Sequence, residues 1–296
     1  MKRLIILILA SVISLSILFF VFSKHQETKK YLQNNTVLIQ HSYILMGDTG
    51  TGNSNQSEVA EGVKSYCSFT QNCKAVFMLG DVIYDEGVTG IKDEQFLTKF
   101  EKPYADISLP FYILFGNHDY IGCTSCYLEY DKLSTKWEIP ARFYLQNYKS
   151  VSFYAIDTEN FDNEQKSWLI NQLSQNSSKW KIVLGHRPIK TFEETKLNEK
   201  WNGDEELKKI LCNFADFYIS GHSHILEDAG QVENCRVRQF ISGTGGSYPR
   251  NVKKPYEGKF YFEDNGFLAL TVSGKNIRFE FFDKTGNSLY NFTAEK

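Results

Sequence analysis

Residues 75–84 read Ala-Val-Phe-Met-Leu-Gly-Asp-Val-Ile-Tyr. Five apolar residues end at Leu79, and Gly80 and Asp81 follow at once. A short apolar run with such an ending is typical of a buried β-strand, and a glycine lets the backbone turn sharply where the strand ends. The sequence therefore predicts that Asp81 stands at the carboxyl end of a strand.

The same arrangement of an apolar run followed by a polar motif recurs along the chain. The five motifs are Gly47-Asp48-Thr49-Gly50, Gly80-Asp81-Val82-Ile83-Tyr84, Gly116-Asn117-His118-Asp119, Val183-Leu184-Gly185-His186 and Gly221-His222-Ser223-His224. Sites in open α/β sheets form at the carboxyl ends of strands. We therefore expect the five motifs to converge on one rim of the fold.

Short strands that alternate with helices predict an α/β fold with central sheets. The apolar runs span residues 43–46, 75–79, 111–115, 151–156, 181–184 and 217–219, with later runs at 237–241, 267–272 and 277–282. Helices are expected over 56–66, 93–100, 128–136, 164–175 and 204–211. The strand-rich C-terminus suggests a second sheet that packs on the first.

The side chains in the five motifs suit a pair of metal ions. Hard and borderline cations take carboxylate, imidazole and amide ligands, and one carboxylate can bridge two ions about 3.5–4 Å apart. Each motif alone has a simpler interpretation, since a Gly-Asp pair is usually a turn and a lone histidine usually a packed or surface residue. The five together, each after an apolar run, favour a two-metal site for phosphoester hydrolysis.

The first 36 residues differ from the rest. Residues 1–23 contain an apolar run from Leu4 to Phe22, long enough to span a bilayer and without a clear small-residue cleavage site. This run has three interpretations. We prefer an uncleaved membrane anchor, then a cleaved signal sequence, and last a buried helix. Residues 24–36 read as a polar linker, and residues 37–296 as one catalytic domain. An anchor or a signal predicts an extracytoplasmic location: secreted, periplasmic or lumenal.

Composition and cysteine usage agree with an exported globular enzyme. The chain has 296 residues, 42% of them hydrophobic, and a net charge of −2, which gives no reason to expect nucleic-acid binding. Its six cysteines could pair as 67–73, 123–126 and 212–235, one of 15 possible connectivities. A redox or zinc motif is the alternative for Cys123 and Cys126, although the usual second ligand pair is missing.

The motifs resemble those of purple acid phosphatases, and especially the small, tartrate-resistant type, within the calcineurin-like metallophosphoesterases. Gly80 to Val88 resembles the GDxxYxxGV block of that type, and residues 242–246 resemble its Gly-rich C-terminal loop. The resemblance covers roughly residues 40–282 and implies a four-layer αββα sandwich of two mixed β-sheets. One departure is Thr49, which stands where the family usually has tryptophan.

The resemblance also implies a ligand set. Fe(III) would be held by Asp48, Tyr84 and His224. The divalent ion would be held by Asn117, His186 and His222, and Asp81 would bridge the two ions. The divalent ion would be Fe(II), Zn(II) or Mn(II). Tyr84 is the discriminating position, because a phenolate is a hard anionic donor suited to Fe(III), whereas many calcineurin-like enzymes have aspartate there.

The expected reaction is hydrolysis of small phosphate monoesters, with metal-bound hydroxide as the nucleophile. His118 is predicted to serve the leaving group as a general acid, or to donate to a phosphoryl oxygen, and Asp119 to orient it. We expect a monomer that is attached to a membrane only if its N-terminal segment is not cleaved. The nearest alternative is a phosphodiesterase or nucleotide pyrophosphatase on the same site, and a non-catalytic scaffold is a more distant one.

Overall fold

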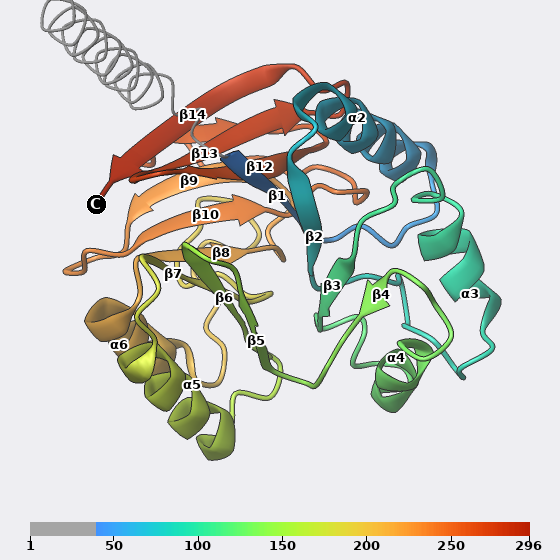
Figure 1. Ribbon diagram of the computed structural model, residues 1–296, viewed down its shortest axis with the longest axis horizontal. Helices are drawn as coiled ribbons and strands as arrows, with labels where there is room; N and C mark the ends of the chain where they lie inside the picture. The colour runs from blue at the N-terminus through green and yellow to red at the C-terminus, as the bar shows by residue number, and fades with distance from the viewer. Residues whose placement is uncertain (1–39) are drawn as a thin grey trace, which may run out of the picture. The chain divides into compact units, whose positions relative to one another are not determined.

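The computed structural model describes residues 40–296 (Figure 1). The predicted anchor or signal at 1–23, the linker at 24–36 and the predicted domain start at residue 37 lie outside the described residues. Among the described helices, none combines the length and the apolar character needed to cross a membrane.

Two mixed seven-stranded sheets form the centre of the fold. The first sheet has the order β14 (Ser288–Glu295), β13 (Asn276–Asp283), β12 (Gly266–Ser273), β1 (Gln40–Met46), β2 (Cys73–Leu79), β3 (Phe111–Leu114) and β4 (Trp137–Glu138). The second has the order β11 (Phe260–Phe262), β9 (Leu226–Gln231), β10 (Arg238–Ser242), β8 (Phe217–Ser220), β7 (Trp180–Leu184), β6 (Val151–Ala155) and β5 (Tyr144–Asn147). Strands β1 to β4 are mutually parallel, as are β6, β7, β8 and β10.

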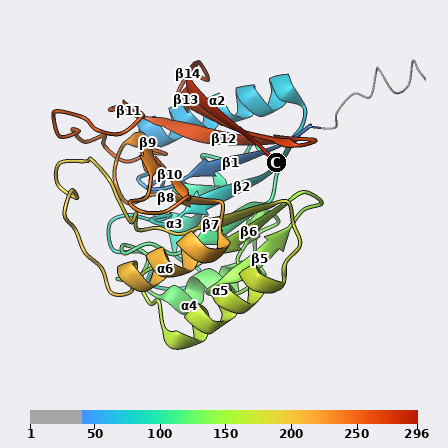
Figure 2. The ribbon, with the colours of Figure 1, turned by 90° about the vertical axis from the view of Figure 1, so that its left-hand side faces the viewer.

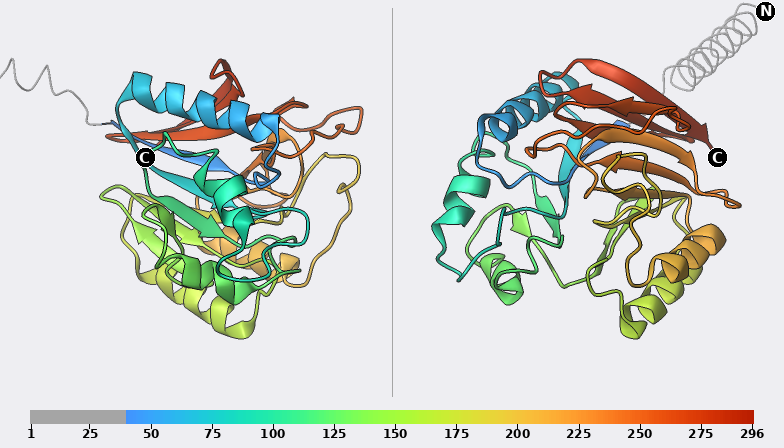
Figure 3. Two further views of the ribbon diagram at one scale, coloured as in Figure 1. Left: turned by 90° about the vertical axis from the view of Figure 1, so that its right-hand side faces the viewer. Right: turned by 180° about the vertical axis from the view of Figure 1, so that it is seen from behind.

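Helices cover the outer faces of the two sheets (Figures 1 and 2). The first sheet packs against α2 (Ser54–Thr70), α3 (Glu94–Phe96) with the following π-helix η1 (Leu97–Glu101), and α4 (Thr124–Tyr130). The second packs against α5 (Asn163–Gln175) and α6 (Asp204–Phe214). A third apolar cluster, with Phe77, Phe153 and Phe240, fills the space between the sheets. These layers confirm the predicted αββα sandwich, which Figure 3 shows from two further sides.

The C-terminal strands do not form the second sheet, contrary to our expectation. Strands β12, β13 and β14 extend the first sheet, because β12 pairs antiparallel with β1. The second sheet is built instead around β6, β7, β8 and β10 from the middle of the chain. An apolar strand can bury its faces equally well in either sheet, so its sequence does not say which one it joins.

The helix predicted over residues 128–136 is also wrong in its bounds. Helix α4 ends at Tyr130, whose ring stacks on Phe96 with 3.8 Å between the centroids. Trp137 then enters β4 opposite Phe111 and is buried. The aromatic core therefore determines where this helix ends, and tertiary packing overrides the local helical preference.

All six cysteines form disulfides, and the pairs are the three that we considered from the sequence: Cys67–Cys73, Cys123–Cys126 and Cys212–Cys235. The Cys123-x-x-Cys126 motif is thus closed within itself. Disulfides persist in oxidising compartments, which agrees with an exported protein.

The Cys212–Cys235 disulfide should contribute most to stability, since it closes the longest loop, with a separation of 23 residues. Replacing both cysteines by serine should lower the free energy of unfolding by about 3 kcal/mol, as measured by denaturant titration. The matched control replaces Cys123 and Cys126, which lie three residues apart, and should lose less. Equal losses in the two variants would contradict a contribution from loop closure.

Candidate metal centre

The five motifs do converge. Asp48, Asp81 and Asn117 follow the parallel strands β1, β2 and β3, and His186 and His222 follow β7 and β8. The two sheets approach closely at this rim, where a Cβ added to Gly47 would lie 3.1 Å from the Gly221 Cα atom. Side chains from both sheets can therefore reach one point.

Asp48, Tyr84 and His224 form a first group of three. The Tyr84 hydroxyl donates to Asp48 Oδ1 at 3.0 Å and lies 3.2 Å from His224 Nε2. His224 Nε2 in turn lies 3.4 Å from Asp48 Oδ1. A carboxylate, a phenol and an imidazole thus present their polar atoms to one small volume.

Asn117, His186 and His222 form a second group. His186 Nε2 lies 3.2 Å from Asn117 Oδ1 and 3.2 Å from His222 Nδ1. Asp81 stands between the two groups: its Oδ2 atom accepts from the Tyr84 hydroxyl at 2.9 Å and lies 3.5 Å from His186 Nε2. All seven side chains predicted as ligands are therefore brought together, in two sets of three joined by one carboxylate.

Three of the seven residues have a left-handed backbone, with φ of 57° at Asp48, 51° at Asp81 and 66° at His222. Residues other than glycine rarely adopt this conformation, which is strained and concentrates at functional sites. The turn directly after each strand imposes it and points the side chain over the sheet edge.

Two motif glycines are required by close packing against these side chains. A Cβ at Gly80 would lie 2.5 Å from His186 Nδ1, and a Cβ at Gly116 would lie 2.3 Å from Asp81 Oδ1. Both are closer than real Cβ contacts, so a side chain at either position would displace a predicted ligand.

The electrostatics of the cluster favour a bound cation. Asp48 and Asp81 are 0% and 1% exposed, and two buried carboxylates are costly without a positive partner. Burial opposes a charge on His186, but Asp81 and Asp48 together raise its pKa to about 10. The two carboxylates that raise this pKa would also attract a metal ion, and Asp48, Asp81 and His186 lie close enough together to hold one.

Tyr84 and His222 show opposite effects of burial. Burial raises the pKa of the Tyr84 phenol, and the Asp48 and Asp81 carboxylates raise it further. The tyrosine would become a phenolate only beside a strong positive charge. Burial lowers the pKa of His222 to about 4, although Glu199 acts in the other direction. His222 is therefore neutral, as an imidazole ligand must be.

Each of the three histidines uses its outward ring nitrogen for a hydrogen bond. The Nδ1 atom of His186 donates to Leu79 O at 2.8 Å, and the Nδ1 atom of His224 donates to Tyr248 O at 3.2 Å. His222 Nε2 contacts the Glu199 carboxylate at 3.0 Å. In the neutral ring the inward nitrogen then carries a lone pair, so these histidines fit a metal centre.

His118 lies beside the cluster, where its ring packs on the Tyr84 ring with 4.5 Å between centroids. Its Nδ1 atom lies 2.5 Å from Asp85 O, and within residues 40–296 nothing is hydrogen-bonded to its Nε2 atom. The expectation that Asp119 orients His118 is wrong. The buried Asp119 carboxylate instead accepts from the backbone N–H groups of Val82, Ile83 and Gly116. Asp119 thus fixes the turns that carry Asp81 and Asn117.

Glu199 was missed by the sequence analysis. It lies in the loop of residues 187–203, 23 positions before His222, and no motif marks it. Arg187 follows His186 directly, but its guanidinium is bound by two carboxylates, with Nε 2.8 Å from Glu159 Oε1 and Nη1 paired to Glu199.

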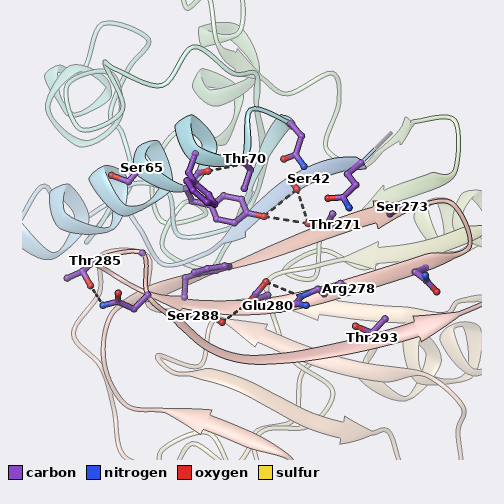
Figure 4. A pocket seen from close by; sticks show the side chains of 18 residues that line it. Ser42, Ser65, Thr70, Thr271, Ser273, Arg278, Glu280, Thr285, Ser288 and Thr293 are labelled. Carbon is purple, nitrogen blue, oxygen red and sulfur yellow. Dashed lines mark hydrogen bonds and ion pairs between the residues drawn. The ribbon is translucent and has the colours of Figure 1, made fainter. Parts of the chain in front are cut away.

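A cavity of about 510 Å³ opens beside the cluster. Tyr84 and His224 line it together with Lys99, Tyr248 and Arg250. A larger groove of about 850 Å³ lies elsewhere, between α2 and the outer face of β12 and β13, and carries mainly hydroxyl and amide side chains (Figure 4). None of the seven clustered residues lines that groove, so the smaller cavity gives access to the cluster.

Comparison with known proteins identifies the family. The sequence profile of the calcineurin-like phosphoesterases matches residues 41–226. The chain belongs to the calcineurin-like phosphoesterase family. The matched region begins in β1 and includes all five motifs.

Relatives place this phosphoesterase among the purple acid phosphatases. It is 30% identical to human tartrate-resistant acid phosphatase type 5 over 260 residues, which cover 73% of this chain and 77% of the relative. It is 29% identical to purple acid phosphatase 3 of Arabidopsis thaliana over 321 residues, with coverage of 93% and 84%. These similarities confirm the resemblance inferred from the motifs, and the protein is a phosphatase.

The fold of this phosphoesterase is also that of a solved structure described as "GAP50 the anchor in the inner membrane complex of Plasmodium". The TM-score is 0.76 at 21% identity, with coverage of 87% of this chain and 89% of the other. At this identity the similarity supports the fold alone.

Proposed function

We propose that the protein is an acid phosphatase that hydrolyses small phosphate monoesters at a dinuclear centre of Fe(III) and a divalent ion. Asp48, Tyr84 and His224 would hold the ferric ion. Asn117, His186 and His222 would hold Fe(II), Zn(II) or Mn(II), and Asp81 would bridge. The support is the arrangement of two groups of three side chains joined by a carboxylate that contacts both.

The position of the Tyr84 hydroxyl carries the proposal. It lies 3.0 Å and 2.9 Å from the oxygens of two buried carboxylates, which oppose its ionisation. A phenolate at this point requires a highly charged, hard cation, and Fe(III) meets that requirement better than a divalent ion. This is the reason to propose iron rather than two zinc or manganese ions.

When bound, the ions would supply positive charge that activates water in mild acid and offsets charge on the phosphoryl oxygens. The protein supplies the position of the substrate. The cavity beside Tyr84 and His224 would take the alcohol part of the ester. The His118 ring does not line that cavity, but it packs on the ring of Tyr84, which does, with 4.5 Å between the centroids. We therefore assign to His118 the proton donated to the leaving oxygen.

The second candidate is a phosphodiesterase or nucleotide pyrophosphatase on the same centre, since the ligands alone do not separate these reactions. The cavity is favourable to it, because Lys99 and Arg250 lie there without a carboxylate within ion-pair distance among the described residues. A second phosphoryl group could contact these cations.

An extracytoplasmic location is part of the proposal, together with a membrane anchor at residues 4–22 if that segment is not cleaved. Three disulfides support export. We propose that the enzyme acts as a monomer.

Replacing Tyr84 with phenylalanine should abolish the visible absorption band of the iron-loaded protein, because the band arises from charge transfer between phenolate and Fe(III). The measurement is a visible spectrum together with elemental analysis of both proteins. A colourless wild type that contains two zinc or two manganese ions would overturn the assignment of iron.

The His118→Ala variant should lower kcat for p-nitrophenyl phosphate by about 10²–10⁴-fold, which is the usual contribution of a general acid. The metal content should stay unchanged, since His118 is not among the seven proposed ligands. Unchanged turnover would exclude the role in leaving-group protonation.

A monoesterase should hydrolyse p-nitrophenyl phosphate faster than bis-p-nitrophenyl phosphate at acid pH. Steady-state rates on both substrates, with the same enzyme preparation, make the comparison. A preference for the diester would favour the second candidate.

A further inference from the structure

The three histidines of the candidate centre differ in what holds their outward nitrogens. Backbone carbonyl oxygens, those of Leu79 and Tyr248, hold His186 and His224. The outward nitrogen of His222 instead contacts side chains: the two Glu199 carboxylate oxygens lie 3.1 Å and 3.0 Å from Nε2, and Arg187 Nη1 lies 3.3 Å from it. A side chain can be replaced without changing the backbone, so this contact can be tested directly.

Glu199 is itself fixed from two directions. Its carboxylate pairs with Arg187 Nη1, and Lys196 Nζ lies 3.1 Å from its Oε2 atom. Arg187 is held in turn by Glu159, with Nε at 2.8 Å and Nη2 at 2.9 Å from the carboxylate oxygens. A row of alternating charges therefore runs from Glu159 through Arg187 and Glu199 to the His222 ring.

The loop of residues 187–203 that carries Glu199 is anchored along its length. Ile189 N donates to Gln239 Oε1 at 2.9 Å, and Thr191 Oγ1 donates to Glu227 Oε2 at 3.0 Å. Near the other end of the loop, Trp201 Nε1 donates to Pro188 O at 3.1 Å. The first two contacts tie the start of the loop to β10 and β9, and the third joins its two ends. Glu199 itself is positioned by Arg187, Lys196 and His222.

We infer that Glu199 is a positioning residue of the centre, which accepts a hydrogen bond from the Nε2–H group of His222 and so fixes Nδ1 as the nitrogen that binds the divalent ion. An ionised carboxylate can only accept, and both Glu199 oxygens lie closer to Nε2 than Arg187 Nη1 does, so Nε2 carries the proton. The adjacent negative charge also makes Nδ1 a stronger donor to a cation. This inference rests on the proposed function.

Glu199 should affect only the divalent-metal position. Asn117, His186 and His222 would hold the divalent ion, whereas Glu199 has no contact with Asp48, Tyr84 or His224. Loss of Glu199 should therefore weaken one of the two metal positions. Removing a partner of this kind usually reduces metal affinity by about 10–100-fold.

The test compares Glu199→Ala, Glu199→Gln and Glu194→Ala in the full-length protein. Glu194 lies exposed in the same loop, and its side chain has no hydrogen bond among the described residues, so its variant is a matched control. Each protein is dialysed against increasing dipicolinate, and iron and the divalent metal are then counted by elemental analysis alongside a visible spectrum.

We expect Glu199→Ala to lose the divalent ion at a chelator concentration about 10–100-fold lower than wild type, with the ferric ion and the visible band retained. Glu199→Gln keeps an acceptor oxygen without the charge and should show a smaller loss, while Glu194→Ala should match wild type. The smaller loss in Glu199→Gln would separate positioning from a general disturbance of the loop.

The inference is overturned if Glu199→Ala retains the divalent ion as wild type does, or if it loses both ions together. If wild type binds both ions and Glu199→Ala retains the divalent ion equally well, this inference alone is refuted. A wild type that binds no second ion would refute the proposed dinuclear centre, and this inference with it.

Discussion

The close approach of the two sheets at the carboxyl ends of β1 and β8 is the constraint on which the site depends. Gly47 and Gly221 meet there with room for no side chain, and hydrogen bonds cross directly between the sheets. Gly47 N donates to Ser242 O at 2.7 Å, and His222 N donates to Asp48 Oδ2 at 2.8 Å. Without this contact, the carboxylates of one sheet and the imidazoles of the other would belong to separate surfaces.

Bringing these groups together buries two negatively charged carboxylates that no lysine or arginine of the described residues neutralises. Within the described residues, the ion-pair partners of Asp48 and Asp81 are histidines, with no lysine or arginine among them. Buried carboxylates in such surroundings require a cation. The left-handed backbone at Asp48, Asp81 and His222 sets the direction in which each of these side chains leaves its strand end.

The proposed ligands are oriented partly by backbone groups and partly by side chains around the cluster. Asp119 binds three backbone N–H groups and fixes two of the turns, while carbonyl oxygens orient His186 and His224. A row of side chains orients His222. The contacts of Asp119, His186 and His224 follow from the strand ends and their adjacent turns, whereas the orientation of His222 depends on the loop of residues 187–203.

The sequence alone determined the α/β class and the five motifs at strand ends, because an apolar run ending in glycine marks a strand end whatever surrounds it. The resemblance added the αββα layers and the set of seven residues that meet at the centre. The cysteine pairing was one of 15 possibilities, and the structure selected it. Only the tertiary structure decided which sheet the C-terminal strands join, where α4 ends, what Asp119 binds and that Glu199 reaches His222. These depend on contacts between residues far apart in the chain, where packing and hydrogen-bond geometry leave no periodic signal to read.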